Sequence, residues 1–485
     1  MIRIVIACTG VCNREFVSFA GPFWAAAASG GKLMSDFIEG IRKREGELEQ
    51  IASSTIKAIL KEGADQCSVY IGGNSGLSVS SRDGCVENIE FNRGNGLSIS
   101  VFRGHRRGSS STTDLRPDAI RRCIESAMSI ASFAGEDPCA GVADPELLCR
   151  DFRDLKLLYP GFDSPDQAAD IAVKLDKLGM EHKGGDIKGS DGSYATASIY
   201  TGCFADSNGF CHASSSSYCS AGLTLLGERG GAMERGSGFT VSRRIDSLWE
   251  PERIAKEALS NTLGKLGPKR VRTGPMNVVF SKGAVQGLIG TLAGAISGGA
   301  LFRRTSFLCD ALGKEIMPSY VGIREDPFVE GGLGSDDCDG EGVRALPMDV
   351  VSGGVLKAYL LATYSSRKLH MKSNGHASGI YNWDVHFGDG RELPFDELLA
   401  KAGEGIVVEE LMGQGTDLAS GNYSHGAAGN YFKDGRKVHP VAGITIAGNL
   451  RDMYRRMELM SDSFDPRYRV HTGAILVKGM TVSGN

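Results

Sequence analysis

The chain has 485 residues, of which 41% are apolar and 23% are charged. This length predicts two or three domains with buried cores, and the composition excludes an intrinsically disordered chain. A formal net charge of −4 gives no overall basic field for nucleic acid, and no apolar run approaches the roughly 18–20 residues of a membrane span. We therefore expect neither nucleic acid nor membrane as a partner.

Glycine and cysteine usage narrow the class further. The 66 glycines are dispersed without a three-residue period, which predicts many tight turns and much antiparallel sheet. The twelve cysteines include no CxxC pair, and all lie at or before Cys338. A chain of this size needs no disulfide framework, so we expect reduced, mostly buried thiols and a cytoplasmic location.

The first 33 residues are unusual. Ile2 to Cys8 is apolar, and Ala25 to Ala28 followed by Ser29 has the small residues of a signal-peptide cleavage site. Arg14 and Glu15 interrupt the apolar segment that a signal peptide needs. We interpret residues 1–33 as an extension that need not belong to the fold, with Met34 as an alternative start.

Residues 34–135 predict an N-terminal helix–meander–helix domain. Apolar residues fall on one helical face from Met34 to Lys61, and Asp114 to Ala134 predicts a second helix, with Asp114 as its cap and Pro117 in its first turn. Short alternating strands lie between them, at 67–72, 77–81, 86–91 and 97–102. We place turns between these strands at Gly73, Gly76, Gly84 and 94–96.

Residues 150–265 predict a middle α/β domain. Ser164-Pro165-Asp166-Gln167 is a capping box for a helix that runs to about His182. Strands rich in Ser, Thr and Tyr follow from Ser193 to Val241, with a hairpin turn at 207–209. A helix from Pro251 to Leu263 closes the domain.

Residues 268–485 predict a larger, β-rich C-terminal domain. Met276 to Phe280 predicts a strand, and the segment 283–300 is apolar and dotted with glycine. Gly353-Gly354 and Asp434-Gly435 mark hairpins, and Ala474 to Val482 predicts a final buried strand. The predicted fold is α+β, with N-terminal α/β units made of antiparallel sheets and flanking helices.

Generic nucleotide and hydrolase motifs are missing. The runs 413–415 and 94–96 lack the third glycine of a dinucleotide loop, and no GxxxxGK[ST] sequence exists. The run 73–76 has the wrong spacing for a nucleophile elbow, and the neighbours Ser424 and His425 do not by themselves make a catalytic dyad. We therefore interpret these glycines as turn residues and not as parts of a nucleotide-binding loop or a nucleophile elbow.

Metal-ligand residues give only weak patterns. None of the nine histidines is followed by glutamate, as it would be in common zinc hydrolases. His370, His376 and His386 form the densest group, but Asn374-Gly375 breaks any helix between the first two, so they would have to converge from loops. A second set has zinc-ligand types at a spacing unlike common zinc knuckles: Cys203, Cys211, His212 and Cys219.

Several stretches resemble one family. They are LHMKSNGHASGIYNW at 369–383, ELMGQGT at 410–416, GNYSHGAAGNYFKDG at 421–435, ITIAGNLRDM at 444–453, DPCAGVAD at 137–144 and EGVR at 341–344. Together they resemble the TldD/PmbA family, on the PmbA (TldE) side, from about Met34 to Asn485. The older family name is modulator of DNA gyrase.

The resemblance implies a cytosolic heterodimer that acts as a metallopeptidase on unfolded peptides. It implies that the TldD-type partner holds zinc on an HExxxH helix, and it places the equivalent helix within Gly287 to Gly294. The residues here, among them Ile289 and Gly290, include no imidazole and no carboxylate. TldD-type chains also draw a cysteine ligand from near the C-terminus, and none follows Cys338 here. We expect no cofactor in this chain and zinc on the partner.

The resulting hypothesis is a non-catalytic subunit that completes a chamber and helps to hold an extended peptide. The segment 413–430 is the predicted chamber wall, with Gly413, Gln414, Gly415, Ser424 and His425 as peptide-binding residues. His425 stands where the resemblance leads us to expect arginine. Peptidase activity is expected only with the partner, and a homodimer can form in its absence. The alternatives are a stand-alone metallopeptidase that uses His370, His376 and His386, and a regulatory binding protein without proteolysis.

Overall fold

The computed structural model describes residues 2–7 and 30–484. Helices make up 26% and strands 41% of the structure, and the sheets are largely antiparallel, which confirms the predicted α+β class. The chain forms two compact units. The first contains 1–227, 235–261 and 340–343, and the second contains 228–234, 262–339 and 344–485.

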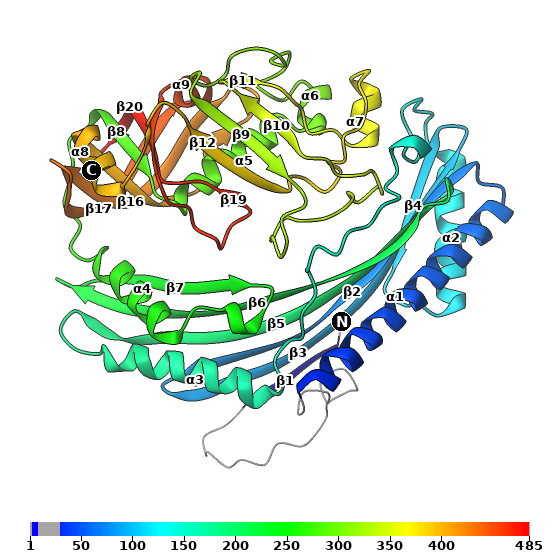
Figure 1. Ribbon diagram of the computed structural model, residues 1–485, viewed down its shortest axis with the longest axis horizontal. Coiled ribbons are helices and arrows are strands. Elements are labelled where there is room, and N and C mark those ends of the chain that lie inside the picture. Colours follow the sequence, from blue (N-terminus) through cyan, green and yellow to red (C-terminus); the bar gives the residue numbers. More distant parts are fainter. Residues whose placement is uncertain (1, 8–29, 485) are drawn as a thin grey trace. The chain divides into compact units, whose positions relative to one another are not determined.

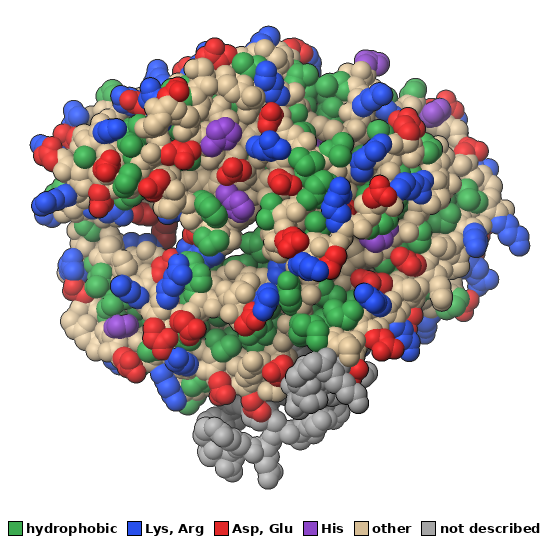
Figure 2. Space-filling view, viewed as in Figure 1, with side chains coloured by type: hydrophobic (Ala, Val, Ile, Leu, Met, Phe, Trp, Pro, Cys, Tyr) green, Lys and Arg blue, Asp and Glu red, His purple; other side chains and the backbone are tan. Residues whose placement is uncertain are grey.

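The surface and the helices agree with the charge and hydropathy of the sequence. On the face shown in Figure 2, basic and acidic side chains are interspersed over the area that is not grey, and neither sign gathers into a broad patch. Among the described residues, no helix is both long enough and apolar enough to cross a membrane.

One long-stranded sheet forms the first unit (Figure 1). Its strand order is β1-β3-β2-β5-β6-β7, and β4 pairs with β3. The N-terminal and middle segments that were separated in sequence therefore contribute to a single sheet. The strands are β1 (Ile2–Ala7), β2 (Gln66–Arg82), β3 (Cys85–Arg103), β4 (Arg106–Thr112), β5 (Ile187–Asp206), β6 (Cys211–Arg229) and β7 (Ala232–Ser242).

The predicted N-terminal extension falls partly within this sheet. Residues 2–7 form β1, which pairs antiparallel with β3, whereas residues 8–29 lie outside the described residues. The first helix begins at Gly30, four residues before the predicted Met34.

Helices pack on the sheet of the first unit and cover two apolar clusters. Helices α1 (Gly30–Lys61) and α2 (Pro117–Phe133) cover a cluster that includes Ile71 and Ile99. Helices α3 (Pro165–Glu181) and α4 (Pro251–Leu263) pack around a second cluster that includes Leu77 and Leu223. Because Ile71 and Leu77 are both odd-numbered residues of β2, both clusters lie on the same face of the sheet.

Helix starts follow the predicted signals in one case and depart from them in another. The Ser164 side chain accepts a hydrogen bond from the Gln167 backbone N–H (3.2 Å), which confirms the predicted cap of α3. Asp114 does not cap α2, because its carboxylate accepts from the backbone N–H of Arg116, which itself occupies the N-cap position. Pro117 is the first residue of α2, as expected.

The sequence predicted turns at several glycines of the first two long strands, and most of these predictions are wrong. Only the Asp83-Gly84 step, with φ of 54° and 74°, forms a two-residue hairpin. Strands β2 and β3 continue through the other predicted turns, and an ideal Cβ on Gly73 would lie 1.9 Å from the carbonyl oxygen of Gly94. These glycines allow neighbouring backbones to approach each other closely in the part of the sheet between the two apolar clusters. In the sequence, they interrupt the alternation of apolar residues in the same way that a turn would.

A closed ring of strands organises the second unit. It runs β20-β17-β16-β14-β8 and closes through the pairing of β20 with β8. The ring strands are β8 (Gly274–Phe280), β14 (Glu404–Met412), β16 (Asn422–Lys433), β17 (Arg436–Asn449) and β20 (Ile475–Ser483), and the short strands β13 (Glu392–Leu393), β15 (Thr416–Asp417) and β18 (Met457–Ser461) extend it.

A second sheet and five described helices complete this unit. The sheet has the order β11-β10-β9-β12-β19, formed by β11 (Val355–Leu356), β10 (Met348–Ser352), β9 (Val321–Asp326), β12 (Asn382–Phe387) and β19 (Val470–His471). The helices are α5 (Ala284–Ala295), α6 (Gly298–Phe302), α7 (Thr363–Lys368), α8 (Phe395–Ala402) and α9 (Leu450–Arg455).

Most turns of the second unit match the sequence. The hairpins at Gly353-Gly354 and Asp434-Gly435 are confirmed, and so is the buried final strand, which becomes β20. The predicted chamber-wall segment 413–430 includes part of a strand, because β16 begins at Asn422. The small residues of β16 weakened its strand pattern, because Gly426 and Gly429 interrupt the apolar alternation.

Gly73→Ala should destabilise the first unit, because its new methyl group would overlap the Gly94 carbonyl oxygen. We expect a loss of roughly 1–3 kcal/mol, the usual cost of overpacking a fixed backbone. Gly46→Ala in α1 is the matched control, since an ideal Cβ there meets nothing within 4 Å. Thermal unfolding followed by circular dichroism should show a lower midpoint for Gly73→Ala only. Equal midpoints for Gly73→Ala and the wild type would contradict this assignment.

Candidate functional site

Helix α5 is held firmly in the second unit. Its buried side chains Val285, Leu288 and Leu292 are inaccessible to solvent and belong to the main core cluster. The Tyr454 hydroxyl donates to the carbonyl oxygen of Leu288 (3.1 Å), and the Ser306 hydroxyl donates to that of Ala295 (2.6 Å). The position and orientation of this helix are therefore fixed by both packing and hydrogen bonds.

The other face of α5 carries three glycines and one small side chain, that of Thr291, whose hydroxyl donates to the carbonyl oxygen of Gly287 (2.8 Å). Gly287, Gly290 and Gly294 recur at three- and four-residue steps, so they lie on one helical face. An ideal Cβ on Gly290 would meet nothing within 4 Å, and those on Gly287 and Gly294 would first meet leucine methyl groups at 3.7 Å and 3.5 Å. These glycines therefore do not serve close packing of a neighbouring backbone. They leave a helix surface bare instead.

The residues of α5 do not fit a zinc ion. Zinc in proteins is bound by imidazole nitrogen, thiolate sulfur or carboxylate oxygen. Helix α5 has none of these groups, and Ile289 in the same segment is fully buried. Across residues 2–7 and 30–484, no group of three or more His, Cys, Asp or Glu side chains is arranged to hold a metal.

The predicted peptide-binding residues come together beside this helix. The backbone N–H of Ser424 donates to the carbonyl oxygen of Gly415 (2.7 Å), and an ideal Cβ on Gly415 would lie only 1.4 Å from the Ser424 carbonyl oxygen. Only glycine fits this crossing, which places 413–415 against Ser424 and His425. Gly413, Gln414 and Ser424 are exposed. Leu411 and Leu418, the nearest neighbours of the α5 glycines, flank the same crossing.

Strand β16 also presents two polar atoms without partners. The Nε2 atom of His425 lies 2.8 Å from the Thr416 hydroxyl, and its ring centroid lies 4.4 Å from that of Tyr423. The Nδ1 atom of His425 and the buried hydroxyl of Tyr423 have no hydrogen-bond partner among the described residues. Burial raises the pKa of Tyr423, so its hydroxyl keeps its proton and can donate.

Tyr423 was missed from the sequence. It lies two residues before His425 on one strand, so strand alternation alone would have placed both side chains on the same face. Tyr423 could have been found only if the sequence had identified 422–433 as a strand. Buried polar groups without partners are uncommon in folded proteins, so Tyr423 and His425 are an unusual feature beside the crossing of Gly415 and Ser424.

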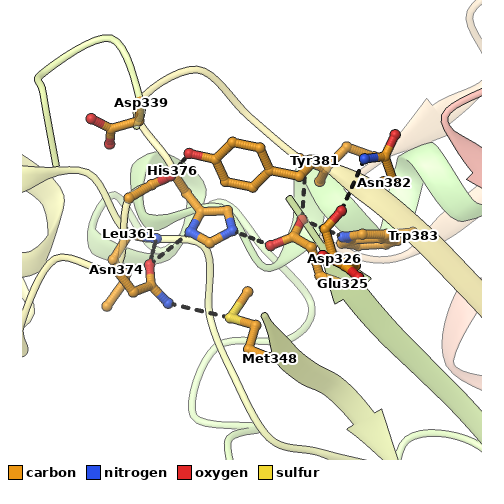
Figure 3. Close-up of polar contacts among 12 residues, drawn as sticks. Glu325, Asp326, Asp339, Met348, Leu361, Asn374, His376, Tyr381, Asn382 and Trp383 are labelled. Atoms are coloured by element: carbon orange, nitrogen blue, oxygen red, sulfur yellow. Dashed lines mark hydrogen bonds and ion pairs between the residues drawn. The ribbon is translucent and has the colours of Figure 1, made fainter. Parts of the chain in front are cut away.

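A buried polar network lies elsewhere in the second unit (Figure 3). Glu325 on β9 is inaccessible to solvent, and its Oε1 atom lies 2.6 Å from Nε2 of His376. Its Oε2 atom accepts hydrogen bonds from the Tyr381 backbone N–H (2.9 Å) and from the Trp383 indole N–H (2.7 Å). The buried carboxylate is thus surrounded by partners, as a buried charge requires.

The second nitrogen of His376 is also occupied. Asn374 donates through Nδ2 to the Tyr359 carbonyl oxygen and accepts through Oδ1 from the Leu361 N–H, both at 2.8 Å. These bonds orient the amide, so the Nδ1 atom of His376 donates to Asn374 Oδ1 at 3.0 Å. With both nitrogens engaged, the ring is a structural group in this arrangement.

The three clustered histidines therefore have different surroundings. The His376 side chain is fully buried between Glu325 and Asn374 (Figure 3), whereas His370 and His386 are exposed. His386 lies on β12 opposite Gly322 of β9. The described residues do not bring the three together as a metal-binding group.

The network fixes strands that contact α5. The backbone N–H of Trp383 donates to the Arg469 carbonyl oxygen (2.9 Å), and Trp383 lies in register with Val470 of β19. The Val470 carbonyl oxygen accepts from the side chain of Gln286 on α5 (3.1 Å). Hydrogen bonds thus lead from the Glu325 carboxylate to the helix with the bare face, and Glu325 has a positioning role.

The cysteine set at 203–219 is only partly brought together. The Sγ atoms of Cys203 and Cys211 are 4.0 Å apart. The His212 ring instead stacks on Phe152, with centroids 3.5 Å apart, and Cys219 contacts the Arg243 carbonyl oxygen at 3.8 Å. The four residues therefore do not converge on one point.

Comparison with protein families accounts for most of the chain. Residues 67–131 match the model described as PmbA/TldA metallopeptidase domain 1, and residues 159–266 match the central domain. Residues 273–484 match the PmbA/TldA metallopeptidase C-terminal domain, which contains α5, β16 and the Glu325 network. The chain therefore belongs to the PmbA/TldD metallopeptidase family.

Individual relatives agree with this assignment. The chain is 38% identical over 452 residues to the metalloprotease PmbA of Escherichia coli O157:H7, an alignment that covers 93% of this chain and 99% of the relative. A Bacteroides thetaiotaomicron structure described as a proposed modulator of DNA gyrase shares the fold, with a TM-score of 0.85, 23% identity, and coverage of 90% and 99% of the two chains. The TldE structure from Thermococcus kodakarensis has a TM-score of 0.77, 19% identity, and coverage of 90% and 100%.

His376→Ala should destabilise the protein strongly. It removes one partner of the buried Glu325 carboxylate, a change that typically costs about 3–5 kcal/mol. His386→Ala is the control, because a substitution at this exposed position should change stability by less than about 0.5 kcal/mol. Urea unfolding followed by circular dichroism measures both. A loss below about 1 kcal/mol for His376→Ala would show that the network is not needed for stability.

Gly290→Ala should stabilise the second unit slightly. Alanine is favoured over glycine in a helix by about 1 kcal/mol, and the new methyl group has room. We expect a gain of roughly 0.5–1 kcal/mol in urea unfolding, similar to that of Gly46→Ala in α1. A loss of stability would mean that another group occupies the bare face.

Proposed function

We propose that this chain is the zinc-free subunit of a two-chain metallopeptidase that acts on unfolded peptides. The observation that carries the proposal is the chemistry of α5. The family name implies a metallopeptidase, but the helix that would hold the metal has a bare glycine face without ligand groups. In this proposal zinc and the hydrolytic step belong to a TldD-type partner, and the complex is cytoplasmic.

The bare face of α5 and the adjoining crossing of β16 hold the peptide in this proposal. A helix face made mostly of glycine lets a peptide main chain approach closely and does not select particular side chains. The exposed Gln414 and Ser424 side chains can hydrogen-bond to peptide groups. Such contacts suit substrates whose sequences vary but whose backbones are extended.

The first test separates the subunits. We expect this chain, purified alone, to contain no stoichiometric zinc by elemental analysis and to leave unfolded, fluorescently labelled casein intact. Co-expression with a TldD-type subunit should give a complex that hydrolyses casein until a chelator is added. Stoichiometric zinc and chelator-sensitive hydrolysis by this chain alone would falsify the proposal, and a lack of any complex would favour a regulatory protein.

The second test concerns the bare face. In the purified complex, Gly290→Tyr should lower kcat/KM for casein by roughly tenfold or more, equivalent to at least about 1.4 kcal/mol, because the aromatic ring occupies the space of the peptide. Gly46→Tyr in α1 makes the same substitution on an unrelated open helix position and should leave kcat/KM unchanged. Equal activities for the two variants, with both complexes intact by gel filtration, would remove α5 from the peptide site.

A further inference from the structure

The first unit contains a pair of thiols that the proposed peptidase function does not use. Cys203 on β5 and Cys211 on β6 lie on the two strands of one hairpin, where Cys203 is opposite Ala213 and Cys211 is opposite Ala205. Directly opposed residues share a face, so the two cysteines are diagonal neighbours on the same face of the sheet. Their Sγ atoms are 4.0 Å apart.

The two thiols differ in exposure. Cys211 is exposed, whereas Cys203 is 1% exposed and belongs to the apolar cluster beneath α1 and α2. An oxidant from solvent can therefore reach Cys211 first, while Cys203 lies ready as its neighbour. This is the arrangement of an attacking and a resolving cysteine.

Helix α1 contributes polar groups to the exposed thiol. The Ser53 hydroxyl lies 3.4 Å from Cys211 Sγ, and the Glu49 carbonyl oxygen lies 3.8 Å from it. The hydrogen bond from Cys203 lowers the pKa of Cys211 to about 7, and the Ser53 hydroxyl adds to the lowering. Burial and the nearby Glu49 carboxylate act in the opposite direction and raise it. The same thiol–thiol contact, together with burial, raises the pKa of Cys203. The thiolate, which is the reactive form, is thus concentrated on the accessible sulfur.

We propose that Cys211 and Cys203 form a reversible disulfide when the protein meets a peroxide. The Cys211 thiolate attacks one oxygen of hydrogen peroxide. An S–O bond forms, the O–O bond breaks, and hydroxide leaves. Cys203 sulfur then attacks the sulfenic sulfur of Cys211, so that an S–S bond forms, the S–O bond breaks, and the oxygen leaves as water with the Cys203 proton. Two electrons pass from the sulfurs to the peroxide.

Formation of this bond changes the contact between the hairpin and α1. The Sγ atoms must close from 4.0 Å to about 2 Å, which draws Cys211 away from Ser53 and Glu49. Diagonal residues lie about 7–8 Å apart, beyond the roughly 4.4–6.8 Å between Cα atoms that disulfides usually span, so the two strands must shift to form the bond. The resulting strain should let a small thiol reductant reverse it readily.

The test uses the full-length protein and hydrogen peroxide. After alkylation and digestion, mass spectrometry should show a Cys203–Cys211 linked peptide that has lost two hydrogen atoms and disappears on reduction with dithiothreitol. Cys203→Ser should leave Cys211 as a sulfenic acid that dimedone labels several-fold more strongly than in the wild type. Cys85→Ser removes another exposed thiol and should not change formation of the link. Absence of the linked peptide, or equal dimedone labelling of wild type and Cys203→Ser, overturns the proposal.

The pH profile gives an independent measurement. The rate of Cys211 oxidation should rise roughly tenfold between pH 6 and pH 8 and level off above, as the thiolate of a group with a pKa of about 7 becomes fully populated. Ser53→Ala should move this profile to higher pH. A wild-type midpoint at about 8.5, the value of an ordinary cysteine, would contradict the role of the neighbouring hydroxyl and thiol.

Discussion

The antiparallel pairing of β20 with β8 is the constraint on which the second unit depends. It joins Ile475 to Phe280 and closes the ring of strands that β14, β16 and β17 complete. Closure leaves each of these strands with two neighbours, so their positions are set by hydrogen bonds on both sides. Helix α5 follows β8 directly, and the crossing of Gly415 over Ser424 lies on β16. Both parts of the proposed peptide surface are therefore attached to a frame with little freedom.

Within this frame, the Glu325 network and the bare face of α5 differ in how many polar side chains they contain. The network concentrates polar partners around one buried carboxylate and links β9, β12 and β19 to Gln286 of the helix. The outer face of α5 carries glycines and a single small polar side chain, that of Thr291, whose hydroxyl bonds back to the helix. A rigid support beneath an open surface favours binding of a flexible chain. The protein then loses little conformational entropy of its own when the complex forms.

How far the sequence predicts this structure depends on the kind of residue. Amphipathic helices and two-residue turns were readable because their signals are local. Pro251–Leu263 was predicted to the residue, and Asp434-Gly435 marks its hairpin. Gly73 was misinterpreted because a missing side chain permits a turn, a close approach or an open surface, and only the neighbours decide which. His425 was named from a resemblance, whereas Tyr423 and Glu325 depend on long-range strand pairing that no short pattern contains.

Ring closure also has a consequence for synthesis of the protein. The first unit is assembled mostly from residues that leave the ribosome early, whereas β8 must wait for β20. At about 5–20 residues per second, the interval between Phe280 and Ile475 lasts roughly 10–40 s. During this time the strand pair β14–β16 and the apolar face of α5 have no closed ring to enter. The nascent second unit therefore reaches its native topology only after its final strand has been made.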